Sequence, residues 1–161
     1  MTAFHVHNEP ELFNALRQAK QDDRIWIYGN GETRDYEIHT YTPALIGLTR
    51  GARLKAPHLE LVKVTVDDVC EFYGSAREVR AHRQAKAVVH GRGLVRATGD
   101  AQIEAHDSVY VEAYDATVKA YDTTVVTLLL DGKCDAYDYA HVIKIGCCAT
   151  VNTYGPHVTV T

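Results

Sequence analysis

A short tandem repeat fills most of this chain and constrains its fold more than any other feature. The segments Val95–Gly99, Ile103–Asp107, Val111–Asp115, Val118–Asp122 and Cys134–Asp138 read VRATG, IEAHD, VEAYD, VKAYD and CDAYD. Each unit begins with an apolar residue, has a small residue third, usually an aromatic residue or His fourth, and Asp or Gly fifth. A unit this short cannot bury a core alone, so successive units must stack on one another.

The same register extends along nearly the whole sequence, mostly at intervals of eight residues. Sixteen units result, with an apolar residue first in each and Ala third in seven of them. One long interval contains the stretch from Gly29 to Asp35. The predicted first positions are Ile25, Ile38, Ile46, Leu54, Val62, Cys70, Val79, Ala87, Val95, Ile103, Val111, Val118, Val125, Cys134, Val142 and Val151.

The residue pattern within each unit indicates a short strand followed by a turn. Apolar first and third positions around a polar second position are typical of a strand with one buried face. Asp or Gly in fifth position indicates a turn, because Asp can hydrogen-bond the nearby backbone and Gly can adopt positive φ. Repeated Ala in third position predicts a narrow interior. We therefore predict an all-β fold, a single-stranded parallel β-helix or β-solenoid of short repeats with an N-terminal capping α-helix.

The charges in second position favour two units per coil over three. Opposite charges on neighbouring strands stabilise a sheet, and like charges destabilise it. Three units per coil would give more like-charged than opposite contacts. With two, the expected neighbours are Arg96 with Glu112, Lys55 with Glu71, Lys119 with Glu104 and Asp135, Lys63 with Arg80, and Arg80 with Arg96.

The N-terminal segment predicts a strand followed by the capping helix. Residues 4–7 alternate as a short strand, and residues 8–20 have Asn8 as a helix N-cap with Glu11 three residues later. We expect this helix to cover the open end of the solenoid, because unpaired strand edges invite aggregation. Its predicted apolar stripe comprises Leu12, Phe13, Leu16 and Ala19.

Length and charge limit the classes of protein that fit. The 161 residues suit one structural domain, with residues 1–24 as the cap and residues 25–161 as the repeats. The formal charge of −4 is mixed along the chain, so a nucleic-acid partner is not expected. MTAFHVHNEP lacks the regions of a signal peptide, and no segment approaches the roughly 20 apolar residues of a membrane span. We expect a cytoplasmic protein without a membrane partner.

The four cysteines predict neither metal nor redox chemistry. Cys70 and Cys134 take first positions, where other units carry Val or Ile, so we expect small buried apolar side chains. Cys147 and Cys148 are adjacent and outside the register, without a CxxC pair or a His at zinc spacing. We therefore expect no metal and no cofactor.

Two parts of the chain resemble known families. NEPELFNALRQA followed by DDRIWI resembles the N-terminal caps of right-handed parallel β-helix proteins such as pectate lyases, which implies a fold and no activity. IEAHD, VEAYD, VKAYD and CDAYD resemble a class of tandem-repeat β-solenoid proteins from bacteria and their phages, from which VVTLL, VIKIG and LKAPH depart. That class supplies no catalytic motif. The resemblance implies a phage or prophage origin, with the protein in the host cytoplasm or on the virion.

Two units per coil place the fourth positions along two edges of the solenoid. One edge, which we call the aromatic ladder, carries Tyr73, His90, His106, Tyr121, Tyr137 and Tyr154. The fifth positions beside it are Gly74, Gly91, Asp107, Asp122, Asp138 and Gly155. The opposite edge carries Thr65, His82, Thr98, Tyr114, Leu128 and Ile145.

The aromatic ladder has two interpretations. A rigid strip of amphipathic rings beside carboxylates can bind a protein or a sugar. Alternatively, stacked rings stabilise neighbouring strands and Asp caps the turns. Carboxylates of successive coils, ~5 Å apart, would suit glycoside cleavage, but a residue that is the consensus of its repeat argues against a catalytic pair. The predicted binding residues are Tyr73, His90, His106, Asp107, Tyr121, Asp122, Tyr137, Asp138 and Tyr154.

The sequence therefore predicts a non-catalytic structural or protein-binding module and not an enzyme. The alternative is a carbohydrate-binding or carbohydrate-cleaving β-helix that uses the same edge. Loops of minimal length favour a protein partner, because a sugar groove needs inserted loops. The chain closes with HVTVT and no second helix, so we also expect a homo-oligomer through the C-terminal coil.

Overall fold

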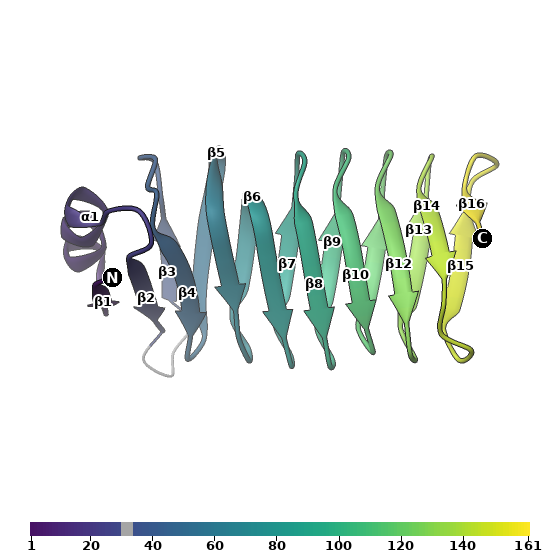
Figure 1. The fold of residues 1–161 in the computed structure, drawn as a ribbon, viewed down its shortest axis with the longest axis horizontal. Coiled ribbons are helices and arrows are strands. Elements are labelled where there is room, and N and C mark those ends of the chain that lie inside the picture. Colours follow the sequence, from purple (N-terminus) through teal and green to yellow (C-terminus); the bar gives the residue numbers. More distant parts are fainter. Residues whose placement is uncertain (30–33) are drawn as a thin grey trace.

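The computed structural model describes residues 1–29 and 34–161 and shows a parallel β-solenoid of about 8 turns (Figure 1). Strands make up 56% of the chain and helix 6%. Successive units pair alternately, so that each coil contains two strands. The predictions of the fold class and of two units per coil are therefore confirmed.

The strands form two faces, which we name after their position in Figure 1. Two long strands, β5 (Ala52–Val66) and β6 (Glu71–His82), bend from the far face onto the near face and join both into one sheet. The near face also contains β2 (Arg24–Tyr28), β4 (Leu45–Thr49), β8 (Leu94–Thr98), β10 (Tyr110–Tyr114), β12 (Val125–Leu129), β14 (His141–Lys144) and β16 (Thr159–Val160). The far face also contains β3 (Arg34–Glu37), β7 (Lys86–Val89), β9 (Gln102–Ala105), β11 (Thr117–Ala120), β13 (Lys133–Tyr137) and β15 (Thr150–Tyr154).

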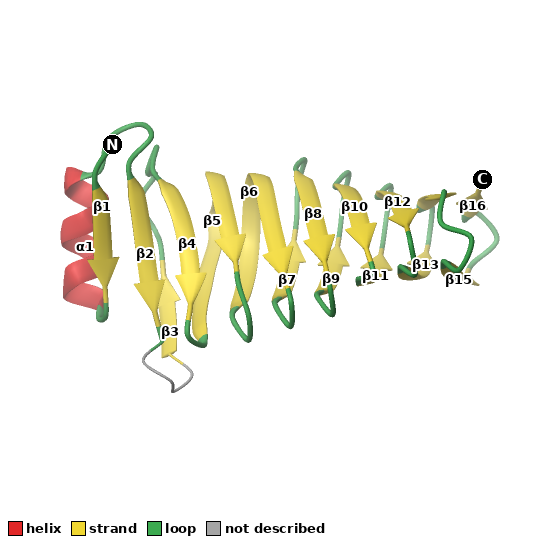
Figure 2. Ribbon diagram, turned by 60° about the horizontal axis from the view of Figure 1, so that its bottom comes forward, coloured by secondary structure: helices red, strands yellow, loops and turns green. Residues whose placement is uncertain are grey.

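The coil is right-handed. In Figure 1 the near strands run downward and the far strands upward while the chain advances from the N-terminal to the C-terminal end, and Figure 2 shows the same arrangement from a second side. Twisted parallel strands favour this hand in their crossover connections.

Inward-facing side chains stack on their equivalents in the next coil. Buried Ala residues fill third positions on both faces, and they keep the two faces close together, as the sequence predicts. Larger buried side chains, such as those of Tyr36 and Phe72, lie nearer the N-terminal end. The Ala columns contain Ala81, Ala97 and Ala113 on the near face and Ala105, Ala120 and Ala136 on the far face.

Three predicted units are displaced by two residues. The pairing of β5 with β6 is interrupted between Ala56 and Glu60, and the extra residues on β5 displace the two units that follow. The third displaced unit precedes this interruption, so its shift comes from the longer connection between β3 and β4. A shift of two residues leaves the same side chains inside, so hydrophobic alternation does not detect it. The observed first positions are Tyr36 in place of Ile38, Val64 in place of Val62 and Phe72 in place of Cys70.

A fourth unit is displaced by one residue. Val111 pairs with Val126, so Val126 and Leu128 are buried, whereas Val125 and Leu129 lie on the outer surface. Both alternations of VVTLL are largely apolar, so the pattern by itself does not choose between them. The opposite edge therefore carries Leu129 where the sequence predicted Leu128.

The displacement of β5 and β6 changes two predicted charge contacts. Glu71 forms an ion pair with Arg53, with Oε2 3.0 Å from Nε, and not with Lys55. Lys63 Nζ bonds Glu78 Oε2 at 3.1 Å instead of facing a like charge. The remaining predicted neighbours are confirmed, namely Arg96 with Glu112 and Arg80, and Lys119 with Glu104 and Asp135.

The N-terminal strand and helix form as predicted. Strand β1 (Ala3–Val6) pairs with β2, and helix α1 (Glu9–Gln18) follows. The Asn8 side chain accepts a hydrogen bond from the Glu11 amide at 2.9 Å, and Glu11 Oε2 accepts one from the His7 amide at 2.7 Å. The backbone hydrogen bond from His7 lowers the pKa of Glu11. Asn8 is thus the N-cap.

The apolar stripe of α1 differs from the prediction at one residue. Leu12 and Ala15 are buried and Leu16 is half-buried, but Phe13 is 58% exposed and lies beneath the Arg17 guanidinium. Phe13 follows Leu12 directly, and adjacent helical residues point in different directions. The buried stripe therefore includes Ala15 and not Phe13.

The Ala columns predict that the interior does not accept larger side chains. Ala97→Leu should lower the free energy of unfolding by about 1–3 kcal/mol, because it forces Ala81 and Ala113 apart. Urea denaturation measures the shift. Lys133→Leu, at an exposed site, is the control, and we expect it to change stability by no more than about 0.5 kcal/mol. Equal effects of both substitutions would contradict a tightly packed interior.

Candidate functional site

The predicted aromatic ladder forms along the turns that follow the far-face strands. Ring centroids are 4.7 Å apart between His90 and His106, 4.7 Å between His106 and Tyr121, 4.6 Å between Tyr121 and Tyr137, and 4.8 Å between Tyr137 and Tyr154. The planes of each pair lie within 14° of parallel. These distances match the ~4.8 Å spacing of neighbouring strands, so each coil adds one ring to the stack.

Tyr73 contacts the ladder in a different way. Its ring centroid lies 5.3 Å from that of His90 at an interplanar angle of 65°, an edge-on contact. The reason is the displaced register of β6, in which Tyr73 pairs with Val88 and not with a fourth-position residue. The parallel stack therefore begins at His90, and Tyr73 contacts that end of it by its ring edge.

The Asp residues beside the ladder accept hydrogen bonds from backbone amides of the preceding coil. Asp107 Oδ2 accepts a hydrogen bond from the Gly91 amide at 2.8 Å, and Asp122 Oδ2 accepts one from the Asp107 amide at 3.0 Å. Asp138 Oδ2 lies 3.4 Å from the Asp122 amide nitrogen in the same arrangement. The three Asp residues have φ values of 62°, 55° and 55°, in the left-handed region that Asp tolerates better than most residues. These carboxylates stabilise the turns.

His106 is the ladder residue with the most polar contacts. Its Nε2 lies 3.0 Å from Glu104 Oε1, and its Nδ1 lies 3.9 Å from Asp122 Oδ2. The neighbouring His90 has a buried Nε2 without a hydrogen-bond partner among the described residues. The two imidazoles thus differ in environment although they stack directly.

Two tyrosine hydroxyls at the centre of the ladder, those of Tyr121 and Tyr137, have raised pKa values and so remain protonated at neutral pH. Partial burial raises the pKa of Tyr121, and Glu104 adds to this effect. Desolvation likewise raises the pKa of Tyr137, with a contribution from Asp135. The ladder therefore presents hydroxyl groups that can both donate and accept hydrogen bonds.

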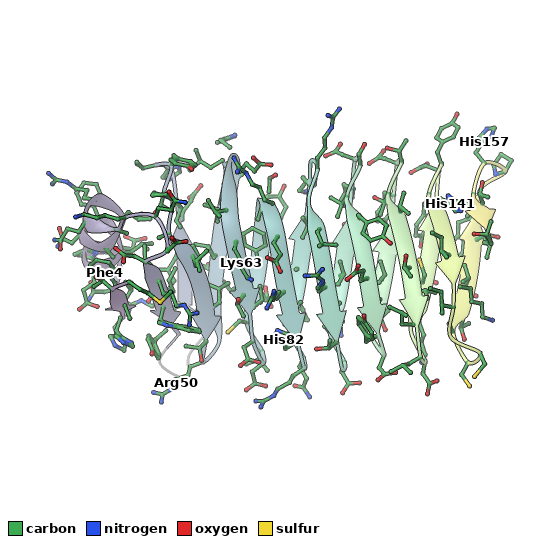
Figure 3. The ribbon with its side chains drawn as sticks, in the orientation of Figure 1. Phe4, Arg50, Lys63, His82, His141 and His157 are labelled. Atoms are coloured by element: carbon green, nitrogen blue, oxygen red, sulfur yellow. The ribbon has the colours of Figure 1, made fainter. Side chains whose placement is uncertain are left out.

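A second aromatic pair, which the sequence pattern did not identify, lies at the same edge. The rings of Tyr139 and His157 stack at 4.7 Å, and Tyr139 is largely exposed. Figure 3 shows His157 at the upper turns near the C-terminal end, whereas Arg50 and His82 lie at the lower turns. Tyr139 and His157 are separated by more than one octad, so only the stacking of coils brings them together.

The opposite edge and the outer near face carry apolar residues near the C-terminal end. Tyr114, Leu130 and Ile145 are exposed, and Leu129 is half-buried. Their grouping follows from the one-residue displacement of β12. The sequence signal was present in VVTLL and VIKIG, whose outward positions are also apolar.

The terminal coil has inward positions that are partly polar. Lys144 and Thr153 occupy third positions, where earlier coils carry Ala or Leu, and both are exposed. Val151 and Val158 remain half-buried. This mixed surface can be solvated and can also contact another molecule.

The burial of Cys70 and Cys134 is as the sequence predicted, although Phe72 takes the first position that was assigned to Cys70. Cys70 and Cys134 are buried, and Cys147 and Cys148 are exposed with their sulfur atoms 3.5 Å apart. Burial raises the pKa of Cys134 to about 12 and also raises the pKa of Cys70. Among the described residues, no group of three or more His, Cys, Asp or Glu side chains is arranged to hold a metal ion.

The fold and this edge define the chain as a parallel β-solenoid protein with a column of stacked aromatic side chains. No protein-family model, curated protein or solved structure shows a significant match to it. In the part of the chain that the structure describes, no helix is long and apolar enough to cross a membrane.

The hydrogen bonds of Asp107, Asp122 and Asp138, which we call the Asp column, predict a structural role for Asp122. Asp122→Ala should lower the free energy of unfolding by roughly 1–3 kcal/mol, because it removes a carboxylate acceptor and places Ala at positive φ. Asp122→Asn should cost less, since Asn keeps an acceptor and tolerates this conformation. Thermal melts measure both. Asp100→Ala is the control, at an exposed site whose carboxylate bonds no described residue. An equal loss there would contradict the role of Asp122.

The buried thiols predict a pH-dependent loss of stability. The thiol of Cys134 keeps its proton up to about pH 12 when the chain is folded, but only to about pH 8.5 when it is unfolded. The contribution of this thiol to the free energy of unfolding is complete below its pKa in the unfolded chain. It is lost as the pH rises from that value towards the pKa in the folded chain. Melts across this range should show a smaller loss for Cys134→Val than for the wild type, and equal slopes would contradict the prediction.

Proposed function

We propose that this chain is a non-catalytic structural or protein-binding module whose binding surface is the aromatic ladder. The observation that carries the proposal is the unbroken stack from His90 to Tyr154, with ring spacings of 4.6 to 4.8 Å. Stacked rings have few conformations, so a partner can bind them at little cost in side-chain entropy. Hydroxyl and imidazole groups at the ring edges supply hydrogen bonds beside this apolar area.

The geometry favours a protein partner over a glycan at this edge. The faces of the ladder rings are covered by the next ring, so ring edges and polar atoms remain for a partner. A sugar that packs on an aromatic side chain needs an open ring face. The turns beside the ladder are also short, and each reverses the chain around one residue at positive φ, namely Asp107, Asp122 or Asp138. Turns this short do not project far enough to form the side of a sugar-binding groove.

The Asp column supports a non-catalytic role. A carboxylate that acts as a nucleophile or a general acid must reach the substrate. Oxygen atoms of Asp107 and Asp122 instead accept hydrogen bonds from backbone amides of the preceding coil. A carbohydrate-cleaving β-helix on this edge would need carboxylates that are free of such contacts.

We also propose a biological setting, from the repeat, and an assembly state, from the last coil. The octads resemble those of bacterial and phage solenoid proteins, so we propose an accessory role in a phage or mobile element, in the host cytoplasm or on the virion. The half-buried Val151 and Val158 on the terminal coil suit pairing with a second copy, and we propose this as the route to a homo-oligomer.

A pull-down from extract of the source cells tests the ladder as a binding surface. The wild type should retain a protein that Tyr121→Ser/Tyr137→Ser loses, because these substitutions remove two adjacent rings from the centre of the stack. Mass spectrometry identifies the retained protein, and circular dichroism checks that each variant is folded.

The matched control removes two tyrosines from the near face. Tyr110→Ser/Tyr114→Ser, both on β10, should keep the partner. Loss of the partner with this control and not with the ladder variant would move the binding surface to the near face. If the wild type retains nothing, the ladder is structural and the proposal of a binding module fails.

A further inference from the structure

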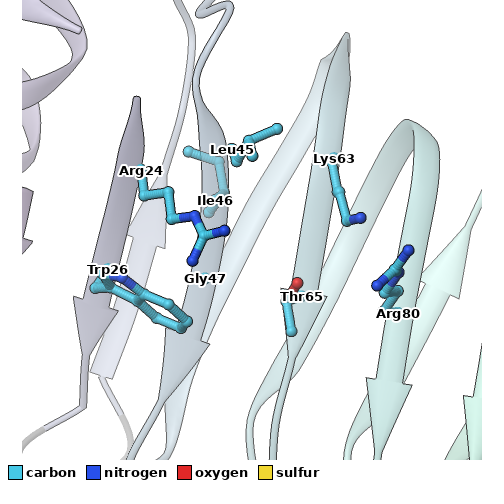
Figure 4. Close-up of a pocket in the computed structure, with 8 residues that line it drawn as sticks. All are labelled: Arg24, Trp26, Leu45, Ile46, Gly47, Lys63, Thr65 and Arg80. Carbon is cyan, nitrogen blue, oxygen red and sulfur yellow. The ribbon is translucent and has the colours of Figure 1, made fainter. Parts of the chain in front are cut away.

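A depression lies on the outer near face at the N-terminal end of the solenoid, far along the chain from the ladder. Figure 4 shows the indole of Trp26 at one end, with Lys63 and Arg80 at the other. Its volume is about 160 Å³. The lining residues are Arg24, Trp26, Leu45, Ile46, Gly47, Lys63, Thr65 and Arg80.

The depression exists because small side chains separate two large ones in the same row. Trp26 pairs with Gly47, Gly47 with Thr65, and Thr65 with Arg80 across four neighbouring strands. The indole lies directly over Gly47, where an added Cβ would clash with Trp26 Cε3. Any larger residue at Gly47 would displace the indole. The floor is therefore formed by Gly47 and Thr65, between Trp26 and Arg80.

The charge around this depression is positive. Three cationic side chains line it, and the only carboxylate that bonds them among the described residues is that of Glu78, at 2.6 Å from Arg80 Nε and 3.1 Å from Lys63 Nζ. Partial burial opposes ionisation of Glu78, but hydrogen bonds from Arg80 and Lys63 outweigh it and lower its pKa. Three positive charges against one negative charge leave an excess of two.

Arg24 supplies the cation that is not neutralised. The Arg24 side chain makes no hydrogen bond or ion pair with any described residue, and its backbone is fixed by the pairing of β2 with β4. Glu78 also forms an ion pair with Arg96, with its Oε1 3.3 Å from Arg96 Nη1. The cations of the depression can thus bind an external anion without first breaking a strong pair at Arg24.

We propose that this depression binds one ring of an acidic saccharide, with the sugar ring against Trp26 and its carboxylate or sulfate against Arg24 and Lys63. The C–H face of a pyranose suits an indole, and charged donors bind such anions with short, strong hydrogen bonds. Thr65 offers a hydroxyl for the ring. The volume is below the ~300–1,000 Å³ that encloses drug-sized ligands, so the site accepts one ring of a chain that continues along the face.

A nucleic acid fits these observations less well. Nucleic-acid surfaces combine stacking with an extended basic track along the backbone. The formal net charge of the whole chain is −4. Along the near face, Arg80 pairs with Arg96, and the next strand places Glu112 beside Arg96, so the positive charge does not continue. The proposal is independent of the aromatic ladder, which lies at the turns and not on this face.

The single tryptophan of the chain makes the test specific for the site. A fluorescence titration with a hyaluronan tetrasaccharide should give a saturable change in Trp26 emission that weakens with added salt. Chitotetraose, a neutral oligosaccharide of the same size, should bind about tenfold or more weakly, because the charged contact is missing.

Charge variants identify the contacts. Arg24→Gln/Lys63→Gln should reduce the affinity by about tenfold or more. Arg92→Gln, at an exposed position in the turn between β7 and β8 at the ladder edge, should leave it unchanged. Circular dichroism establishes that each variant is folded. No emission change with the acidic tetrasaccharide, or equal binding by both charge variants, would overturn the proposal. Tighter binding of a short oligothymidylate to the same residues would overturn it in favour of a nucleic acid.

Discussion

The in-register, hydrogen-bonded stacking of each coil on the next is the constraint on which the rest of this structure depends. Parallel pairing places equivalent residues of successive coils one strand spacing apart, ~4.8 Å. Ala97 therefore lies between Ala81 and Ala113, and the Tyr121 ring lies 4.6 Å from that of Tyr137. A side chain is tolerated in this solenoid when it can repeat at that distance. Small apolar residues satisfy the condition inside, flat rings satisfy it at one edge, and Asp satisfies it at the turns by bonding the preceding coil.

The same constraint gives the aromatic ladder two roles at once. Ring stacking between coils contributes to stability, and it also holds the ring edges in a fixed row that a partner can contact. Function and stability are therefore coupled at Tyr121 and Tyr137. The depression at Trp26 arises differently, because it is a departure from the repeat: a large residue next to Gly47 leaves unfilled space and unshared positive charge. In a periodic scaffold, departures of this kind are the places where a specific ligand can be recognised.

The regularity of the octads explains which features could be predicted from the sequence. From Ala87 onward the spacing is nearly even, and the stack from His90 to Tyr154 follows directly from two units per coil. The wrongly predicted first positions lie in segments where two different registers would bury equally suitable residues. The interruption between Ala56 and Glu60 moved two units by two residues, and the long connection between β3 and β4 moved a third. Shifts of two residues leave the buried set unchanged. In VVTLL both alternations are apolar, so only the pairing of β10 with β12 decides which residues face outward.

The sequence by itself determined the solenoid, its narrow Ala-filled interior, the capping helix with Asn8 as N-cap and the ladder from His90 onward, because each of these depends on residue type at a fixed short period. Tertiary structure decided the position of Phe13 and the meeting of Tyr139 with His157. It also decided the assembly of Arg24, Trp26, Lys63 and Arg80 around one depression. These residues lie on β2, β5 and β6, which belong to different coils, and their distances depend on the register of β5 and β6, which no local pattern of alternating residues specifies.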